Sequence, residues 1–79
     1  MNLEIISPEK KVFSDEVKIV TVPGSLGSFQ MLKNHAPIVS TLEKGNVVIK
    51  KNDDSEVKIP ITSGLLECKN NRICILIEN

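Results

Sequence analysis

Turn-forming residues interrupt this sequence about every eight residues, and this rhythm constrains the fold more than any other feature of the chain. Pro, Gly, Asn, Asp and Ser mark the interruptions, and the intervals between them hold mostly Ile, Val and Leu. β-Branched side chains favour strands over helices. No window shows a helical period of useful length, so the pattern predicts an all-β fold.

The strands that this pattern predicts are short and follow one another along the whole chain. They lie at residues 3–6, 11–13, 17–22, 27–32, 38–42, 46–50, 56–61, 64–68 and 72–77. Such a succession is typical of a sandwich or barrel, and 79 residues make a single domain, residues 1–79. Pro60 cannot donate a hydrogen bond to a neighbouring strand, so residues 56–61 should form an edge strand or carry a bulge.

The two cysteines lie on either side of Asn70-Asn71, a sequence typical of a two-residue hairpin turn. This turn places Cys68 opposite Ile73 and Cys74 opposite Glu67. Because side chains alternate along a strand, the two thiols then point to opposite faces of the sheet. We therefore expect two reduced thiols and no disulfide, in a monomeric chain.

Charge and composition exclude several classes of partner. Ten basic and ten acidic residues cancel, and Phe13 and Phe29 are the only aromatic residues. A nucleic-acid-binding domain would need a basic surface or stacking aromatic rings. No apolar stretch approaches the roughly 20 residues that span a bilayer, and the first residues lack the features of a signal peptide. We expect no nucleic acid, no direct membrane insertion, and a cytosolic or organelle-internal chain.

No motif for catalysis, for a cofactor or for a metal is present. His35 is the only histidine, and it has no nucleophile or orienting acid at a recognisable spacing. Gly24 and Gly27 lack the Lys-Ser/Thr of a phosphate-binding loop, and residues 52–55 lack the spaced ligands of a calcium loop. His35 is therefore interpreted either as a residue that orders its own loop or as a contact at a protein interface.

The segment from Pro23 to Pro37 carries the strongest loop signals. Pro23-Gly24 ends a strand, and Gly27 tolerates a positive φ. In His35-Ala36-Pro37, the proline favours an extended Ala36. A β-scaffold with these residues displays two stiff loops at its surface, and surface loops often carry binding residues.

Five segments occur in order along the chain: residues 5–14, residues 22–27, His35-Ala36-Pro37, residues 45–49 and residues 63–67. At these spacings the chain resembles the N-terminal domain of the ε subunit of F-type ATP synthases, from about Leu3 to Ile77. The resemblance implies a flattened β-sandwich or barrel of about ten short antiparallel strands without significant helix.

The resemblance also implies a function. Such a domain is a non-catalytic subunit of the central stalk, or rotor, and it needs no cofactor. It links the γ subunit to the c-ring and helps to couple proton or sodium flow to ATP synthesis. It lies peripherally at the cytoplasmic face of the bacterial inner membrane.

Carried over residue by residue, the resemblance gives two interfaces. The turn Ser25-Leu26-Gly27-Ser28 corresponds to the c-ring contact. The side that faces γ carries Ser7, His35 and Ser40. Family members often have an acidic residue where Ser28 stands, and they usually have glycine where Asn34 stands, a change that asparagine tolerates in left-handed backbone.

Full-length bacterial members of this family continue into a helical hairpin. This chain ends at Glu78-Asn79, directly after the last expected strand. We therefore expect a short form without the hairpin. A free-standing β-sandwich module, such as a carrier or an adaptor, is the alternative. A carrier would need a modified lysine at a hairpin tip, and an enzyme would need the catalytic groups that the sequence lacks.

Overall fold

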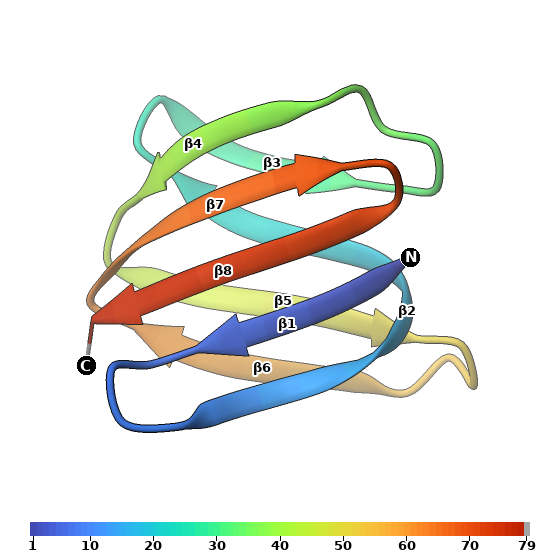
Figure 1. Ribbon diagram of the computed structural model, residues 1–79, viewed down its shortest axis with the longest axis horizontal. Coiled ribbons are helices and arrows are strands. Elements are labelled where there is room, and N and C mark those ends of the chain that lie inside the picture. Colours follow the sequence, from blue (N-terminus) through green and yellow to red (C-terminus); the bar gives the residue numbers. More distant parts are fainter. Residues whose placement is uncertain (79) are drawn as a thin grey trace.

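The computed structural model describes residues 1–78, which form eight β-strands and no helix (Figure 1). The strands are β1 (Asn2–Ile6), β2 (Lys11–Gly24), β3 (Gly27–Met31), β4 (Ile38–Leu42), β5 (Gly45–Lys51), β6 (Glu56–Ile61), β7 (Ser63–Lys69) and β8 (Arg72–Glu78). The all-β prediction is confirmed. The expected number of about ten strands is corrected to eight within the described residues.

One long strand accounts for part of this difference. The sequence predicts separate strands at residues 11–13 and 17–22, but both belong to the 14-residue strand β2. The first half of β2 pairs with β1, and its second half pairs with β3 and β5. The pairing with β5 shifts register between Val17 and Ile19. A bulge of this kind bends a strand, and β2 can therefore cross from one layer to the other.

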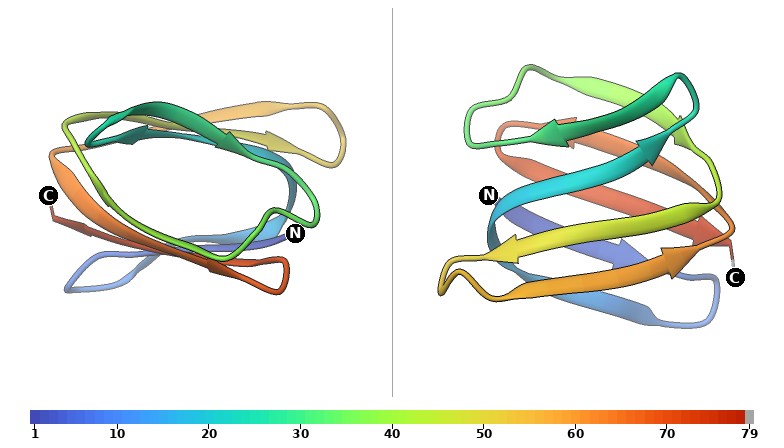
Figure 2. Two further views of the ribbon diagram at one scale, coloured as in Figure 1. Left: turned by 90° about the horizontal axis from the view of Figure 1, so that it is seen from above. Right: turned by 180° about the vertical axis from the view of Figure 1, so that it is seen from behind.

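The strands form two layers that face each other, as the view from above in Figure 2 shows. The order of neighbours is β1-β8-β7-β4-β2-β5-β6, with β3 paired to β2 and a further pairing between β1 and β2. In Figure 1, β4, β7, β8 and β1 lie in front, and β3, β5 and β6 lie behind. Pro60 lies in β6, which pairs only with β5 along this path, so the prediction of an edge strand is confirmed.

The pairing of β1 with β8 corrects the expectation that all strands are antiparallel. Leu3 pairs with Ile73 and Ile5 with Ile75 in parallel register, whereas the other pairings are antiparallel. Hairpin turns force consecutive strands to be antiparallel, but β1 and β8 are separated by almost the whole chain and carry no such constraint.

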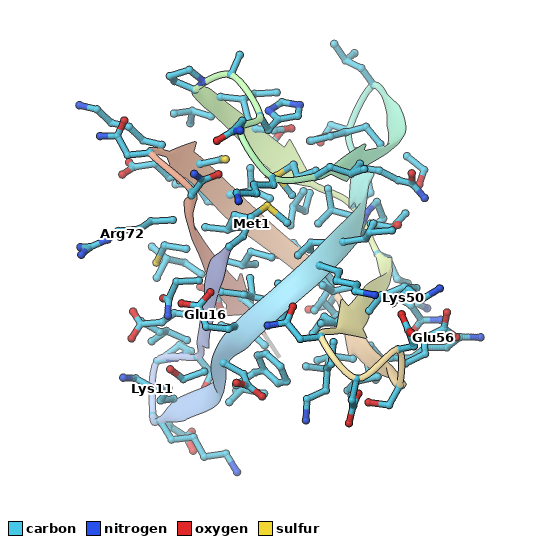
Figure 3. All side chains as sticks on the ribbon, turned by 90° about the vertical axis from the view of Figure 1, so that its right-hand side faces the viewer. Met1, Lys11, Glu16, Lys50, Glu56 and Arg72 are labelled. Carbon is cyan, nitrogen blue, oxygen red and sulfur yellow. The ribbon has the colours of Figure 1, made fainter. Side chains whose placement is uncertain are left out.

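The N-terminus is held at the middle of the long strand β2. The Met1 ammonium group donates to the Val17 carbonyl oxygen at 3.2 Å and lies 3.4 Å from Oε2 of Glu16 (Figure 3). This anchor keeps β1 in place between β8 and β2.

Aliphatic side chains fill the space between the two layers. The buried hydrophobic residues are Leu3, Ile5, Val17, Val20, Val22, Met31, Leu42, Val47, Ile49, Ile61, Leu66, Cys68, Ile73, Ile75 and Ile77. They alternate with exposed residues along most strands, as expected for sheets with one buried face. No polar or charged residue among residues 1–78 is buried.

The β7–β8 hairpin has the turn and the register that the sequence predicts. Asn70 and Asn71 have φ values of 52° and 60°, the left-handed values that a two-residue hairpin turn requires. Cys68 pairs with Ile73, and Glu67 pairs with Cys74. Cys68 is buried in the core, Cys74 is only partly buried, and both thiols are free.

This arrangement predicts different reactivities for the two thiols. Burial raises the pKa of both, and Glu4 and Glu67 raise the pKa of Cys74 further. Cys74 should nevertheless react with a maleimide at least about tenfold faster than Cys68, because Cys68 becomes accessible only when the structure opens. Peptide mapping by mass spectrometry after timed labelling gives both rates. Equal rates in the folded protein would contradict the register of the hairpin.

Candidate functional site

The turn between β2 and β3 presents an exposed leucine at the tip of a tight hairpin. Gly24 pairs with Gly27, so that Ser25 and Leu26 form the connection, and the Leu26 side chain is fully exposed at 105%. Gly27 has a φ of 127°, which only glycine adopts readily. A Cβ atom on Gly24 would lie 2.7 Å from the carbonyl oxygen of Gly27 and 2.7 Å from the Phe29 ring. Both glycines are therefore required for the shape of this turn.

The same turn is attached to β4 by its first residue. The Ser25 amide donates to the Thr41 carbonyl oxygen at 3.1 Å, and the two hydroxyl groups are hydrogen-bonded at 2.8 Å. On the other side, the Glu43 amide donates to the Pro23 carbonyl oxygen at 2.8 Å. These bonds fix the base of the turn, so Leu26 projects from a rigid support.

The His35 loop lies at the opposite end of β3 and connects it to β4. The His35 amide donates to the Leu32 carbonyl oxygen at 3.1 Å. Nδ1 of His35 lies 2.7 Å from the Ala36 carbonyl oxygen. Because a carbonyl oxygen can only accept, Nδ1–H donates in this bond, and Nε2 is left available to a partner. The loop thus orders His35 and gives its outer nitrogen a defined role.

The structure separates the three residues that are expected to face γ, which are Ser7, His35 and Ser40. Ser7 follows β1, and its hydroxyl group closes a turn with the backbone of Lys10. Ser40 lies within β4 opposite the buried Leu66, and its hydroxyl group donates to the Thr41 carbonyl oxygen. His35 lies in the loop that precedes β4. The three residues therefore do not form one cluster.

A groove joins Ser7 to residues that the sequence pattern does not single out. It has a volume of about 690 Å³, and Ser7, Thr41, Leu65 and Leu76 are among the residues that line it. Leu65 pairs with both Thr41 and Leu76, so these side chains form a row across three strands. Leu65 and Leu76 are 42% and 48% exposed.

The row belongs to a larger surface, which we call the outer face: the outward-pointing side chains of β4, β7, β8 and β1. Val39, 66% exposed, lies beside this row and pairs with Glu67. Contiguous apolar side chains on the surface of a small domain are typical of an interaction site. The sequence indicates this surface within residues 64–68, where two leucines follow each other. One of them points inward to the core, and the other points outward.

Two features are absent from residues 1–78, a cluster of metal-ligating side chains and a membrane-spanning helix. Among residues 1–78 no group of three or more His, Cys, Asp or Glu side chains could hold a metal ion. Within the same range no helix is long and apolar enough to cross a membrane.

The chain matches a known protein family over its whole length. The family described as ATP synthase, Delta/Epsilon chain, beta-sandwich domain, matches residues 1–79. The chain belongs to this family, which confirms the resemblance found in the sequence. The observed β-sandwich agrees with the fold that the family description states.

Two relatives illustrate the range of the match. The ATP synthase epsilon chain of Sulfurovum sp. is 42% identical over 78 residues, which are 99% of this chain and 61% of that protein. The ATP synthase epsilon chain of Chlorobaculum tepidum is 40% identical over 76 residues, which are 96% of this chain and 86% of that protein. The chain therefore spans about three fifths of one relative and most of the other.

Solved structures show the same fold at low sequence identity. A chain of the Euglena gracilis mitochondrial ATP synthase, from a structure of its OSCP/F1/c-ring, has a TM-score of 0.89 at 17% identity. That match covers 95% of this chain and 48% of the other. A chain from the central stalk and c-ring of the Tetrahymena thermophila mitochondrial ATP synthase has a TM-score of 0.84 at 18% identity, covering 100% and 63%.

Proposed function

We propose that this chain is a rotor subunit of an F-type ATP synthase that links the γ subunit to the c-ring. In this role it couples ion translocation to ATP synthesis without doing chemistry itself. It acts at the cytoplasmic face of the bacterial membrane as a peripheral component. Membership of the epsilon-chain family supports this proposal, as do the ATP synthase complexes from which similar folds are known.

The c-ring contact is assigned to the turn Ser25-Leu26-Gly27-Ser28. Because the backbone that carries the exposed Leu26 is already held in place, little backbone entropy is lost when a partner buries this side chain. Leu26 is therefore the main apolar contact, and Ser25 and Ser28 offer hydroxyl groups beside it.

The γ contact is assigned to the outer face, with Ser7 at one end and His35 at the other. Ser40 shares the inward phase of its buried partner Leu66, so its side chain does not belong to this face. Leu65 and Leu76 supply the apolar area between the two ends, and Nε2 of His35 offers γ a hydrogen-bonding group.

The observation that carries the proposal is the match of residues 1–79 to the epsilon-chain family, and the hydrogen bond between the two surfaces adds to it. Thr41 lines the groove of the outer face, and its hydroxyl group is bonded to that of Ser25 in the c-ring turn. A single side chain thus connects the two assigned interfaces. The two assigned interfaces therefore adjoin each other, as is suitable for a subunit that contacts two partners at once.

Reconstitution tests the proposed function. The chain is added to membranes that hold its own ATP synthase depleted of the epsilon chain, and ATP-driven ion pumping is measured. We expect pumping to be restored and the chain to remain bound to γ after washing. If His35→Asp and Leu26→Asp variants were retained and coupled as well as the unmodified chain, the assignment of both docking surfaces would be wrong.

A further inference from the structure

Two asparagines join the His35 loop to the β7–β8 hairpin across 37 positions of the sequence. The Asn34 amide N–H donates to Oδ1 of Asn71 at 2.6 Å. The side-chain nitrogen Nδ2 of Asn71 donates to Oδ1 of Asn34 at 3.1 Å. Asn71 therefore uses its acceptor and its donor toward one residue, which fixes the orientation of both amide groups.

The backbone conformation of both residues suits this pair. Asn34 and Asn71 have φ values of 67° and 60°, in the left-handed region that asparagine and glycine tolerate best. Glycine is favoured over asparagine at the second position of a two-residue hairpin turn. The turn alone thus does not require the side chain of Asn71, whose amide is used for the contact with the loop.

The bonds to Asn71 reach outside the loop. Its own hydrogen bonds, from the His35 amide to Leu32 and from the His35 ring to Ala36, lie within the loop. The loop also passes from β3 in the rear layer to β4 in the front layer (Figure 1). The bonds to Asn71 tie it to the hairpin of the front layer, next to a polar depression of about 1090 Å³ that Lys33, Asn71 and Arg72 help to line.

We propose that Asn71 is a positioning residue that holds the His35 loop in its docking conformation. This inference rests on the proposed function only in its second part, that the held loop binds γ. With the loop fixed in advance, less conformational entropy is lost on docking, and the affinity for γ is correspondingly higher. Asn71 itself need not touch γ.

The test compares Asn71→Gly with Asn70→Gly. Both changes keep a residue that tolerates the left-handed turn, whose φ is 52° at Asn70, but only the first removes the amide bonded to the loop. In Asn71→Gly we expect the Asn34 amide to exchange its hydrogen about three- to tenfold faster, the size typical of one or two lost exposed hydrogen bonds. NMR-detected exchange on the isolated chain measures this, and thermal unfolding of both variants provides the stability reference.

A rescue variant separates positioning from a general loss of stability. In Asn71→Asp the carboxylate can accept from the Asn34 N–H and, after the Asn34 amide turns over, from its side-chain nitrogen as well. Slow exchange at Asn34 should return in this variant. If Asn71→Gly and Asn70→Gly gave the same exchange rate at Asn34, the positioning role would be refuted.

The affinity for γ tests the second part of the proposal, which is that the held loop binds γ. The affinity of purified γ for Asn71→Gly should fall about three- to tenfold relative to Asn70→Gly, in line with the cost of ordering a loop. A faster-exchanging loop with unchanged affinity would overturn the role of Asn71 in docking. If the unmodified chain itself failed to bind γ, the proposed function would fail, and the exchange rates would still decide whether Asn71 holds the loop.

Discussion

Leu66→Ala is expected to cost about 2–5 kcal/mol of unfolding free energy, the range for truncating a buried leucine. The Leu66 side chain is 0% exposed, and it lies in β7 between its partners Ser40 in β4 and Ile75 in β8. A domain of 79 residues has a total stability of about 4–12 kcal/mol at 0.05–0.15 kcal/mol per residue. The substitution therefore removes a large fraction of the stability, and a urea titration should show a much lower midpoint.

The neighbouring leucine provides a matched control. Leu65 belongs to the same strand and is 42% exposed on the outer face. Leu65→Ala deletes the same atoms but leaves no internal cavity, so its cost should stay below about 1 kcal/mol. If both variants lost a similar amount of unfolding free energy at an unchanged m-value, Leu65 and Leu66 would not point to opposite faces of β7.

The local features of this fold could be predicted because they depend on neighbouring residues. Asn70-Asn71 defines a hairpin turn, and the turn alone sets the pairing of Cys68 with Ile73. Pro60 lacks a backbone N–H, which limits its strand to an edge or a bulge, and the strand lies at an edge. The Leu26 turn was found for the same reason, since its proline and glycines determine the local backbone.

The features that were missed depend on contacts between distant residues. Nothing near Ser14 and Asp15 indicates that β2 continues through them, because their pairing partners in β1 come from another part of the chain. The parallel pairing of β1 with β8 likewise involves the two ends of the chain.

The candidate site likewise depends on contacts between distant residues. Thr41, Leu65 and Leu76 form a row only through the registers of β4 with β7 and of β7 with β8. Asn71 fits its turn well, and only the folded structure shows the use of its amide toward Asn34. Sequence patterns therefore located the loops, whereas the surface that connects them required the structure.

Leu26→Asp should weaken the binding of the chain to the c-ring about 10- to 100-fold. Burial of a leucine side chain contributes about 1.5–3 kcal/mol, and 1.4 kcal/mol corresponds to a factor of ten. Leu26 is fully exposed in the chain alone, so a partner that covers it gains most of this free energy. Aspartate loses that gain and must also be desolvated. The measurement is the affinity of the γ complex of each variant for c-rings in lipid nanodiscs.

The control places the same charge at a tip far from the turn. Asn52→Asp adds one negative charge to the exposed connection between β5 and β6, outside both assigned interfaces. It should bind c-rings as the unmodified chain does, and both variants should keep their unfolding midpoints, because neither position contributes to the core. A selective loss in Leu26→Asp then identifies a short-range apolar contact. Equal weakening in both variants would instead mean that long-range charge, rather than burial of Leu26, governs the association.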